Sequence, residues 1–199
     1  MSQIEGTPPG RSTYERSFLF GERVALRGVL RMDMNLYRGW LDDSEITHFL
    51  EMGFRPTSDH DLETVFKLST ETHDNIVFTI TDKQSGQAVG FVGLYAINWV
   101  CRRGDYRIII GERESLGRGL GTEVAKLVVA YGFETLNLEV MTLGVNSENH
   151  RAIQSYENAG FVREGVRRKM IYRNNRYYDI LQMSVLRDEY YANKPGSPA

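Results

Sequence analysis

A glycine-rich segment with the sequence LGRGLGT, at residues 116–122, constrains the fold more than any other part of the chain. It follows the apolar, β-branched run 105–110 and precedes a helical pattern of apolar residues that begins near Thr122. A strand that leads through glycines into a helix leaves main-chain N–H groups unpaired at the helix start, where the helix dipole favours an anion. Glycines also let a ligand approach the main chain closely, because they have no Cβ atom. The segment therefore predicts a phosphate-binding turn.

Two well-known phosphate-binding motifs do not describe this segment. A P-loop ends in Gly-Lys-Ser/Thr, whereas Gly121 is followed by Thr122 and Glu123. A dinucleotide-binding loop has a third small residue three positions after its second glycine. Here Gly119 leads to Thr122, and Gly121 leads to Val124. The segment by itself leaves two alternatives open, a phosphate-binding turn of another kind and a glycine-rich turn without a ligand.

A second informative segment, NSENHRAIQSYENAGF, lies at residues 146–161. It predicts a short helix over 149–158. Asn149 and Tyr156 are seven residues apart, which is two helical turns, so they share one face of that helix. The pair Gly160-Phe161 then ends the helix and begins a strand. This arrangement brings an amide and a phenol to the same side of the helix.

Taken together, the two segments resemble the acetyl-CoA signatures of the GNAT N-acetyltransferase superfamily. The first resembles the family's x-x-G-x-G/A pyrophosphate loop. One position departs from the pattern, because the family usually has Gln or Arg where this chain has Leu116. The loop binds phosphate mainly through main-chain N–H groups, so the departure removes a side-chain contact at most. The second segment is similar to the N-x-x-A-x-x-x-Y-x-x-x-G-F helix through Asn149, Ala152, Tyr156, Gly160 and Phe161.

The resemblance covers residues 23–190, which is most of the chain. Within the superfamily, the sequence is most similar to the branch that holds spermidine N-acetyltransferases and ribosomal-protein N-terminal acetyltransferases. The segments that resemble the polyamine enzymes are Ala96-Ile97-Asn98, Arg102-Arg103, residues 106–110, Lys126, Tyr131-Gly132-Phe133 and Leu136-Asn137-Leu138.

The order of the patterns predicts an α/β (α+β) fold. The resemblance implies the GNAT acyl-CoA N-acyltransferase fold, with a central, mixed, mostly antiparallel, twisted sheet and helices on both faces. We expect a single domain at residues 14–192 between disordered tails at 1–13 and 193–199, which are rich in Gly, Pro and Ser. Strands are expected at 18–28, 76–81, 88–99, 105–110 and 138–145, helices at 32–41, 59–71, from Thr122 and at 149–158, and a final hairpin with arms 161–172 and 177–186.

The resemblance also implies an activity and a catalytic residue. It implies an acetyl-CoA-dependent enzyme that moves an acetyl group to a primary amine by direct transfer in a ternary complex. At the family's position for the general acid the chain has Tyr156. A phenol with a pKa of ~10 can protonate a departing thiolate whose conjugate thiol has a pKa of ~8.5. The alternative is that Tyr156 only packs its ring against the sheet.

Cofactor contacts follow from the same resemblance. The main-chain groups of Arg107, Ile108 and Ile109 are expected to pair with the pantetheine arm as an added strand would. Asn149 is expected to hold that arm through its side-chain amide, and an asparagine at a helix start also commonly caps the helix. The pyrophosphate is expected on the main-chain N–H groups of Gly117, Arg118, Gly119, Leu120, Gly121 and Thr122.

The general base and the acceptor are less constrained. Asp105, where the nearest relatives also carry an acid, is the expected base, with Glu112 at the far end of the same strand as the alternative. The carboxylates at 42–45 and 59–63 suit a cationic amine, although those at 59–63 also suit a capped helix start. Basic residues at 167–169, 173 and 176 suit a phosphate-bearing amino sugar if they form one patch. The acceptor is a small amine (polyamine, amino sugar or aminoglycoside) or a protein N-terminus; alternatively, the chain is a non-catalytic acyl-CoA-binding module.

Composition limits the other possibilities. The chain has 24 Lys and Arg against 26 Asp and Glu, so it has no overall positive field for nucleic acid or an anionic membrane. No apolar run approaches the ~20 residues of a membrane span. Cys101 is the single cysteine, which favours a reducing, cytoplasmic location. The four histidines show no metal-ligand spacing, so no metal site is expected. A homo-oligomer is expected because relatives often form one.

Overall fold

The computed structural model describes residues 17–194, and its main feature is an eight-stranded sheet. The strand order across the sheet is β1-β2-β3-β4-β5-β6-β8-β7. Every neighbouring pair is antiparallel except β5 and β6, which are parallel. The strands are β1 (Leu19–Phe20), β2 (Val24–Gly28), β3 (Ile76–Asp82), β4 (Ala88–Asn98), β5 (Arg103–Ile110), β6 (Val140–Asn146), β7 (Val162–Arg173) and β8 (Arg176–Leu186).

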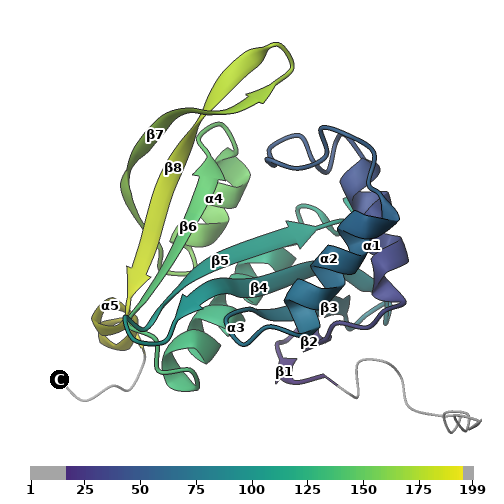
Figure 1. The fold of residues 1–199 in the computed structure, drawn as a ribbon. Helices are drawn as coiled ribbons and strands as arrows, with labels where there is room; N and C mark the ends of the chain where they lie inside the picture. Colours follow the sequence, from purple (N-terminus) through teal and green to yellow (C-terminus); the bar gives the residue numbers. More distant parts are fainter. Residues whose placement is uncertain (1–16, 195–199) are drawn as a thin grey trace, which may run out of the picture.

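Five helices cover the sheet, and they are divided between its two faces (Figure 1). On one face, Val124 and Val128 of α3 and Ile153 of α4 join the larger buried cluster. On the other face, Trp40 of α1 and Leu62 of α2 pack in a separate cluster. The predicted sheet with helices on both faces is thus confirmed. The helices are α1 (Asp33–Asp42), α2 (Asp59–Thr70), α3 (Leu120–Glu134), α4 (His150–Glu157) and α5 (Arg187–Ala192), with a 3-10 turn at Arg113–Ser115.

The sheet divides between β5 and β6. Their parallel pairing is confined to residues 103–105 of β5 and 140–142 of β6. Beyond this point β5 continues along β4, as far as Ile110, while β6 continues along β8 as far as Asn146. The two strands therefore diverge after Asp105, and residues 106–110 of β5 have no ladder partner on the β6 side within the described residues (Figure 1).

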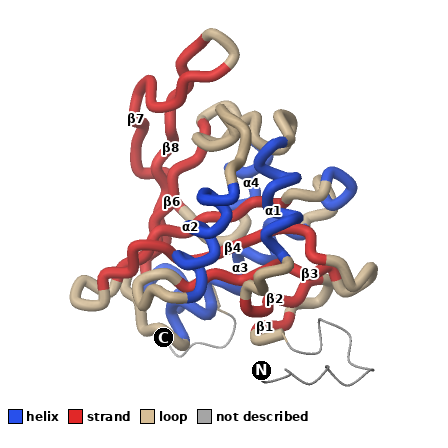
Figure 2. The backbone as a smooth tube through the Cα atoms, turned by 45° about the vertical axis from the view of Figure 1, so that its right-hand side comes forward, coloured by secondary structure: helices blue, strands red, loops and turns tan. Residues whose placement is uncertain are grey.

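The last two strands form a long hairpin that extends beyond the rest of the sheet (Figure 2). Its turn was expected at residues 173–176, and the structure has Asn174 and Asn175 there with φ angles of 51° and 60°. Two consecutive positive φ angles are the requirement of a two-residue type I′ turn, which asparagine tolerates well. The predicted hairpin is therefore built as its sequence indicates.

Two elements differ from the sequence-based expectation. The strand expected at 18–28 is two strands, because the chain turns at Gly21, whose N–H donates to the carbonyl oxygen of Val24 (2.9 Å). Helix α5 follows β8 directly and was not predicted; it has only six residues, too few for a periodic apolar pattern. The tail predicted at 1–13 and residues 195–199 of the tail predicted at 193–199 lie outside the described residues. The domain bounds 14–192 stay a prediction.

Candidate active site

The glycine-rich turn lies between the end of β5 and the start of α3. Gly117 and Gly119 have φ angles of 82° and 76°, a left-handed conformation in which a Cβ atom is strained. The first N–H with a helical partner is that of Glu123, which donates to Gly119 (3.3 Å). For the six preceding residues, 117–122, the structure has no main-chain N–H partner in the described part of the chain. The turn thus offers a run of free donors at a helix N-terminus, as an anion site requires.

Arg23, which directly precedes β2, and Asp82, at the end of β3, hold this turn in place. The Arg23 side chain donates to the carbonyl oxygen of Arg118 (2.5 Å) and to a carboxylate oxygen of Glu123 (2.9 Å). Burial opposes ionisation of Glu123, but hydrogen bonds from the main-chain N–H and guanidinium of Arg23 outweigh it and lower the pKa of this carboxyl. The Arg118 guanidinium points away and pairs with Asp82 (2.7 Å). Arg118 therefore contributes its main chain to the site, and its side chain fixes the turn.

A second cation lies beside the turn and was missed by the sequence analysis. A Cβ atom built on Gly117 would be 2.8 Å from Nη2 of Arg151, so this α4 guanidinium rests against the glycine. No carboxylate partner of Arg151 is present in residues 17–194. The sequence could have indicated this cation, because Arg151 lies between the signature residues Asn149 and Ala152.

The free edge of β5 leads from this turn to the point where β5 and β6 diverge. The N–H of Gly111 donates to Val89 of β4 (2.9 Å). Main-chain groups alternate between the two edges of a strand, so those of Ile108 and Ile110 face the open side and those of Arg107 and Ile109 face β4. Of the three residues predicted to pair with a pantetheine arm, Ile108 has its main-chain groups on the open edge. The main-chain groups of Ile110, which was not among the predicted residues, also lie on the open edge.

Asn149 begins α4 and caps it. Its Oδ1 accepts the N–H of Ala152 (3.1 Å), so the predicted capping role is present. The same side chain keeps its amide NH₂ group for a ligand, because that group has no partner among the described residues. The hydroxyl groups of Thr122 and Ser155 lie 2.9 Å apart and join α3 to α4. The first turn of α3 and the last turn of α4 are therefore linked directly.

Tyr156 lies near the other end of the open edge. Its ring meets that of Tyr106 on β5 edge to face, with 5.9 Å between centroids, and that of Phe161 at 6.0 Å. Burial raises the pKa of the Tyr156 phenol, so the group is protonated at neutral pH. Tyr106 is 2% exposed, and its hydroxyl has no hydrogen-bond partner in the described structure. The site thus holds two neutral phenols, of which sequence analysis identified one.

The two candidate bases are far apart. Asp105 lies where β5 and β6 diverge and forms an ion pair with Arg107 (2.7 Å). Glu112 accepts a hydrogen bond from Nε1 of Trp40 (2.8 Å) beyond the opposite end of β5. Seven residues of extended chain separate the two carboxylates by ~23 Å. They cannot act on the same acceptor nitrogen, and Asp105 is the one that precedes Tyr106 in the chain, whose ring contacts that of Tyr156.

The acidic residues expected near the acceptor are engaged elsewhere. Ser58 and Asp61 form a capping box at the start of α2, and Asp61 also pairs with Arg55 (2.7 Å). Asp43 and Glu45 both pair with Arg113. These carboxylates therefore stabilise local structure and do not form a free anionic wall.

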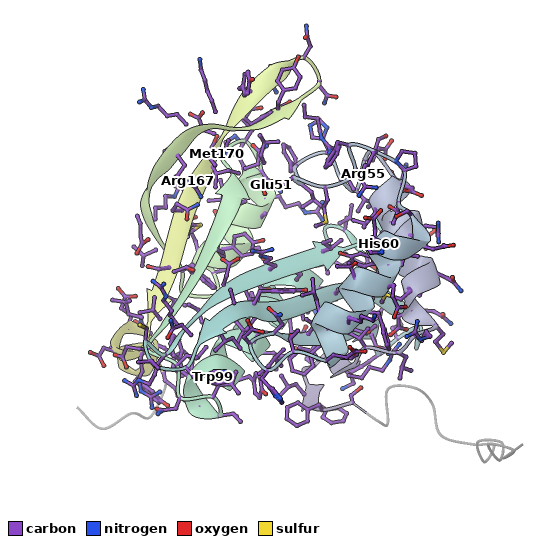
Figure 3. All side chains as sticks on the ribbon, viewed as in Figure 1. Glu51, Arg55, His60, Trp99, Arg167 and Met170 are labelled. Atoms are coloured by element: carbon purple, nitrogen blue, oxygen red, sulfur yellow. The ribbon has the colours of Figure 1, made fainter. Side chains whose placement is uncertain are left out.

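The basic residues of the hairpin are also divided. Arg173 donates to the carbonyl oxygens of Thr47 (2.8 Å) and Met52 (2.6 Å), and Arg176 pairs with Glu148 (2.7 Å). Figure 3 shows Arg167 and Met170 on the hairpin and Arg55 and His60 beside α2, on opposite sides of the molecule's upper end. A cavity of about 740 Å³ lies at this end, lined by Ser44, Glu45, His48, Phe49, Gly53, Phe54, Tyr172, Arg173 and Asn174.

Residues 17–194 contain neither a cluster of metal-ligand side chains nor a helix that could span a membrane. No group of three or more His, Cys, Asp or Glu side chains is arranged to hold a metal ion there. No helix in that part of the chain is long and apolar enough to cross a membrane.

Comparisons with known proteins found relatives of this chain in sequence and in fold. A family model described as "Acetyltransferase (GNAT) domain" matches residues 23–162. Spermidine N(1)-acetyltransferase of Escherichia coli (strain K12) is 37% identical over 173 residues, 86% of each chain. The putative ribosomal N-acetyltransferase YdaF of Bacillus subtilis is 29% identical over 111 residues, 55% of this chain and 59% of the relative. The structure of spermidine N-acetyltransferase from Vibrio cholerae in complex with CoA and spermine has a TM-score of 0.77 and 27% identity, covering 85% of this chain and 99% of that one.

Proposed function

The chain belongs to the GNAT acetyltransferase family and, on that premise, we propose that it acetylates a primary amine of a small molecule, a polyamine-like amine or an amino sugar. The acetyl donor is acetyl-CoA, and the acetyl group passes directly to the amine while both substrates are bound. The observation that carries this proposal is the continuous path from the free N–H groups of the turn at 117–122, along the open edge of β5, to the Tyr156 phenol.

The residues present fit acetyl-CoA along its length. The N–H groups at 117–122 receive the pyrophosphate, and Arg151 supplies a positive charge beside them where Leu116 supplies none. Ile108 and Ile110 offer main-chain groups to the amides of the pantetheine arm, as an added strand would. The NH₂ group of Asn149, which has no partner among the described residues, would donate to the same arm. These contacts aim the thioester toward the point where β5 and β6 diverge.

The chemistry proposed for this point uses two side chains. Asp105 accepts the proton that the acceptor ammonium must lose, directly or through water. The free amine nitrogen then bonds to the thioester carbonyl carbon, and the carbon–sulfur bond breaks. The Tyr156 hydroxyl donates its proton to the departing sulfur, and the phenol regains a proton from solvent or from the amide nitrogen. Acetylated amine and free CoA thiol are the products, so atoms and charge balance.

Assembly and location complete the proposal. A relative from Vibrio cholerae has a dodecameric structure, with a TM-score of 0.72 to this chain. We propose that this chain also associates with copies of itself, because the outer edge of β7 pairs with no strand within residues 17–194 and exposes Val162, Val166 and Met170. Light scattering tests this, since a monomer of 22.8 kDa contradicts it.

The exposed, unpaired thiol of Cys101 fits a cytoplasmic location.

The activity is tested by release of free thiol from acetyl-CoA. A panel of polyamines, amino sugars, aminoglycosides and peptides with free N-termini is supplied in turn, and acetyl-CoA binding is measured by calorimetry. Turnover on a small primary amine is the expected result. Turnover on peptide N-termini alone indicates a protein N-terminal acetyltransferase instead. Tight binding of acetyl-CoA with no turnover on any amine indicates a non-catalytic module.

A further inference from the structure

Arg107 lies beside the carboxylate that is proposed as the general base. It follows Asp105 by two residues on β5, so both side chains are on the face covered by α1 and α2. Its guanidinium donates to a carboxylate oxygen of Asp105 (2.7 Å) and lies over the Tyr95 ring, 5.2 Å from the centroid. The side chain is 63% exposed, against 32% for Asp105. A solvent-exposed cation is therefore paired with the carboxylate that is proposed to receive the acceptor amine.

Besides Asp105, two phenols, those of Tyr37 and Tyr95, lie near this guanidinium. Burial raises the pKa of Tyr37 on α1 to about 12, and the nearby charge of Arg107 works against that rise. Burial likewise raises the pKa of Tyr95. Both phenols are neutral at physiological pH. No second carboxylate pairs with Arg107 in the described residues. Arg107 and Asp105 thus form an isolated ion pair among the described residues, with two neutral phenols beside it.

The Arg107–Asp105 ion pair distinguishes acceptors by the charges that they carry besides the amine. An ammonium group that approaches Asp105 competes with Arg107 for this carboxylate, and a guanidinium that is displaced loses its ion-pair partner. A polyamine has only positive charges and cannot compensate the displaced guanidinium. An acceptor that carries a carboxylate or phosphate near its amine offers a partner to both side chains. Its ammonium group pairs with Asp105, and its anionic group pairs with Arg107, because guanidinium binds carboxylate and phosphate in a bidentate manner.

We propose that Arg107 is a specificity-determining residue of the acceptor site. It favours primary amines that also carry an anionic oxygen group, a carboxylate or a phosphate, over polyamines. This inference rests on the proposed function, and it selects within the amine class given there. A phosphate-bearing amino sugar belongs to the favoured group.

The test uses acceptors that differ only at the end remote from the amine. Butane-1,4-diamine, 4-aminobutan-1-ol and 4-aminobutanoate share a four-carbon chain and carry a cation, a neutral group and a carboxylate. Ethanolamine and 2-aminoethyl phosphate make the corresponding pair for phosphate. Values of kcat and KM are measured by thiol release for the wild type, for Arg107→Gln and for Arg103→Gln. Arg103 is an exposed arginine on the same strand and face, and the described structure gives it no side-chain partner.

The wild type is expected to use an anion-bearing amine with kcat/KM about tenfold or more above that of its matched partner, the size of effect that one charged hydrogen-bonded pair produces. In Arg107→Gln this preference disappears, mainly through KM, and KM for the diamine falls. Arg103→Gln keeps the wild-type preference. Arg107→Lys, which retains the charge without the bidentate geometry, is expected to be intermediate. Equal preference ratios in wild type and Arg107→Gln overturn the proposal, as does a wild-type preference for the diamine that Arg107→Gln does not increase.

Calorimetry separates this inference from the proposed function. 4-Aminobutanoate and 2-aminoethyl phosphate are titrated into the full chain saturated with CoA, so no turnover is needed. Binding to the wild type that weakens about tenfold in Arg107→Gln supports the role of Arg107 even if no amine is acetylated, in which case the proposed function alone fails. Equal binding by both proteins, or none by the wild type, overturns the inference.

Discussion

The rings of Tyr106 and Tyr156 meet edge to face, with 5.9 Å between their centroids and an interplanar angle of 81°. Tyr106 extends from β5 and Tyr156 from α4, so this contact joins the open strand edge to the helix that carries the proposed acid. Burial raises the pKa of both phenols, and the neighbouring Tyr156 adds to the rise at Tyr106. A protonated phenol next to the open edge is the form that a general acid needs.

Replacing Tyr156 by Phe tests that role. The substitution removes the hydroxyl and keeps the ring contacts, so kcat is expected to fall about a hundredfold or more, within the range for loss of a general acid or base. The affinity for acetyl-CoA is expected to change little, because the ring still packs. Steady-state thiol release and calorimetry measure the two quantities. The control Tyr177→Phe, at a tyrosine exposed on the hairpin, is expected to keep wild-type kcat. An unchanged kcat in Tyr156→Phe would show that the residue only packs.

Replacing Tyr106 by Phe is expected to make the folded protein more stable. Its hydroxyl is buried without a partner in the described structure, and such a group costs free energy in the folded state. Tyr106→Phe is expected to raise the free energy of unfolding by about 1 kcal/mol, and Tm by about 2–4 °C for a chain of this size. Thermal and denaturant unfolding of the ligand-free protein measure this change.

A tyrosine with a partner provides the control for Tyr106. The Tyr190 hydroxyl is hydrogen-bonded to Glu134. Tyr190→Phe is therefore expected to lower Tm. A lower Tm in Tyr106→Phe as well would mean that the Tyr106 hydroxyl has a partner, such as a bound water.

The parts of the site that the sequence predicted are those set by local chemistry. Positive φ angles are required at Gly117 and Gly119, and both glycines were identified as a turn before a helix. Asn149 was predicted at a helix start, and it caps α4. The Asn-Asn turn of the final hairpin was located in the same way. In each case a few consecutive residues determine the conformation, so a single sequence suffices.

The parts that could not be predicted depend on contacts between distant segments. Nothing near Arg107 in the sequence indicates its stacking on Tyr95, twelve residues away on another strand. The acidic residues looked available for an amine, but Arg55 and Arg113 neutralise Asp61 and Asp43. The register of β5 against β4 decides which main-chain groups face the open edge, and one residue of slip would exchange them.

A Cβ atom at Gly119 is expected to weaken acetyl-CoA binding. Gly119→Ala must keep a φ of 76°, which costs an L-residue about 1–2 kcal/mol, so the turn relaxes and its N–H groups lose their common direction. The dissociation constant of acetyl-CoA is expected to rise about tenfold, equivalent to about 1.4 kcal/mol. Calorimetry measures it, with Gly39→Ala as control. Gly39 lies in α1, has no strained φ and has open space around its Cβ position. Equal affinity in the two variants would argue against a phosphate-binding turn.

A buried ion pair anchors α1 to the sheet and makes stability depend on pH. Arg27 donates two hydrogen bonds of 2.8 Å to Asp33, and the Thr79 hydroxyl and the Leu30 N–H donate to the same carboxylate. Burial opposes ionisation of Asp33, but these hydrogen bonds outweigh it and lower its pKa. A lowered folded-state pKa adds stability that is complete above the unfolded value of about 3.9 and is lost as pH falls through the folded value.

Asp33→Asn is expected to lower the free energy of unfolding at pH 7 by about 3–5 kcal/mol, because the Arg27 charge stays buried without its counter-ion. The difference between wild type and variant should shrink as pH falls below about 4, where the wild-type carboxyl also becomes protonated. Denaturant unfolding from pH 7 to pH 3 measures both curves. Asp59→Asn, at an ion pair whose carboxylate side chain is 96% exposed, is the control and should follow the wild-type curve closely. A wild-type to Asp33→Asn difference that stays constant over this pH range would mean that Asp33 is not ionised in the folded protein.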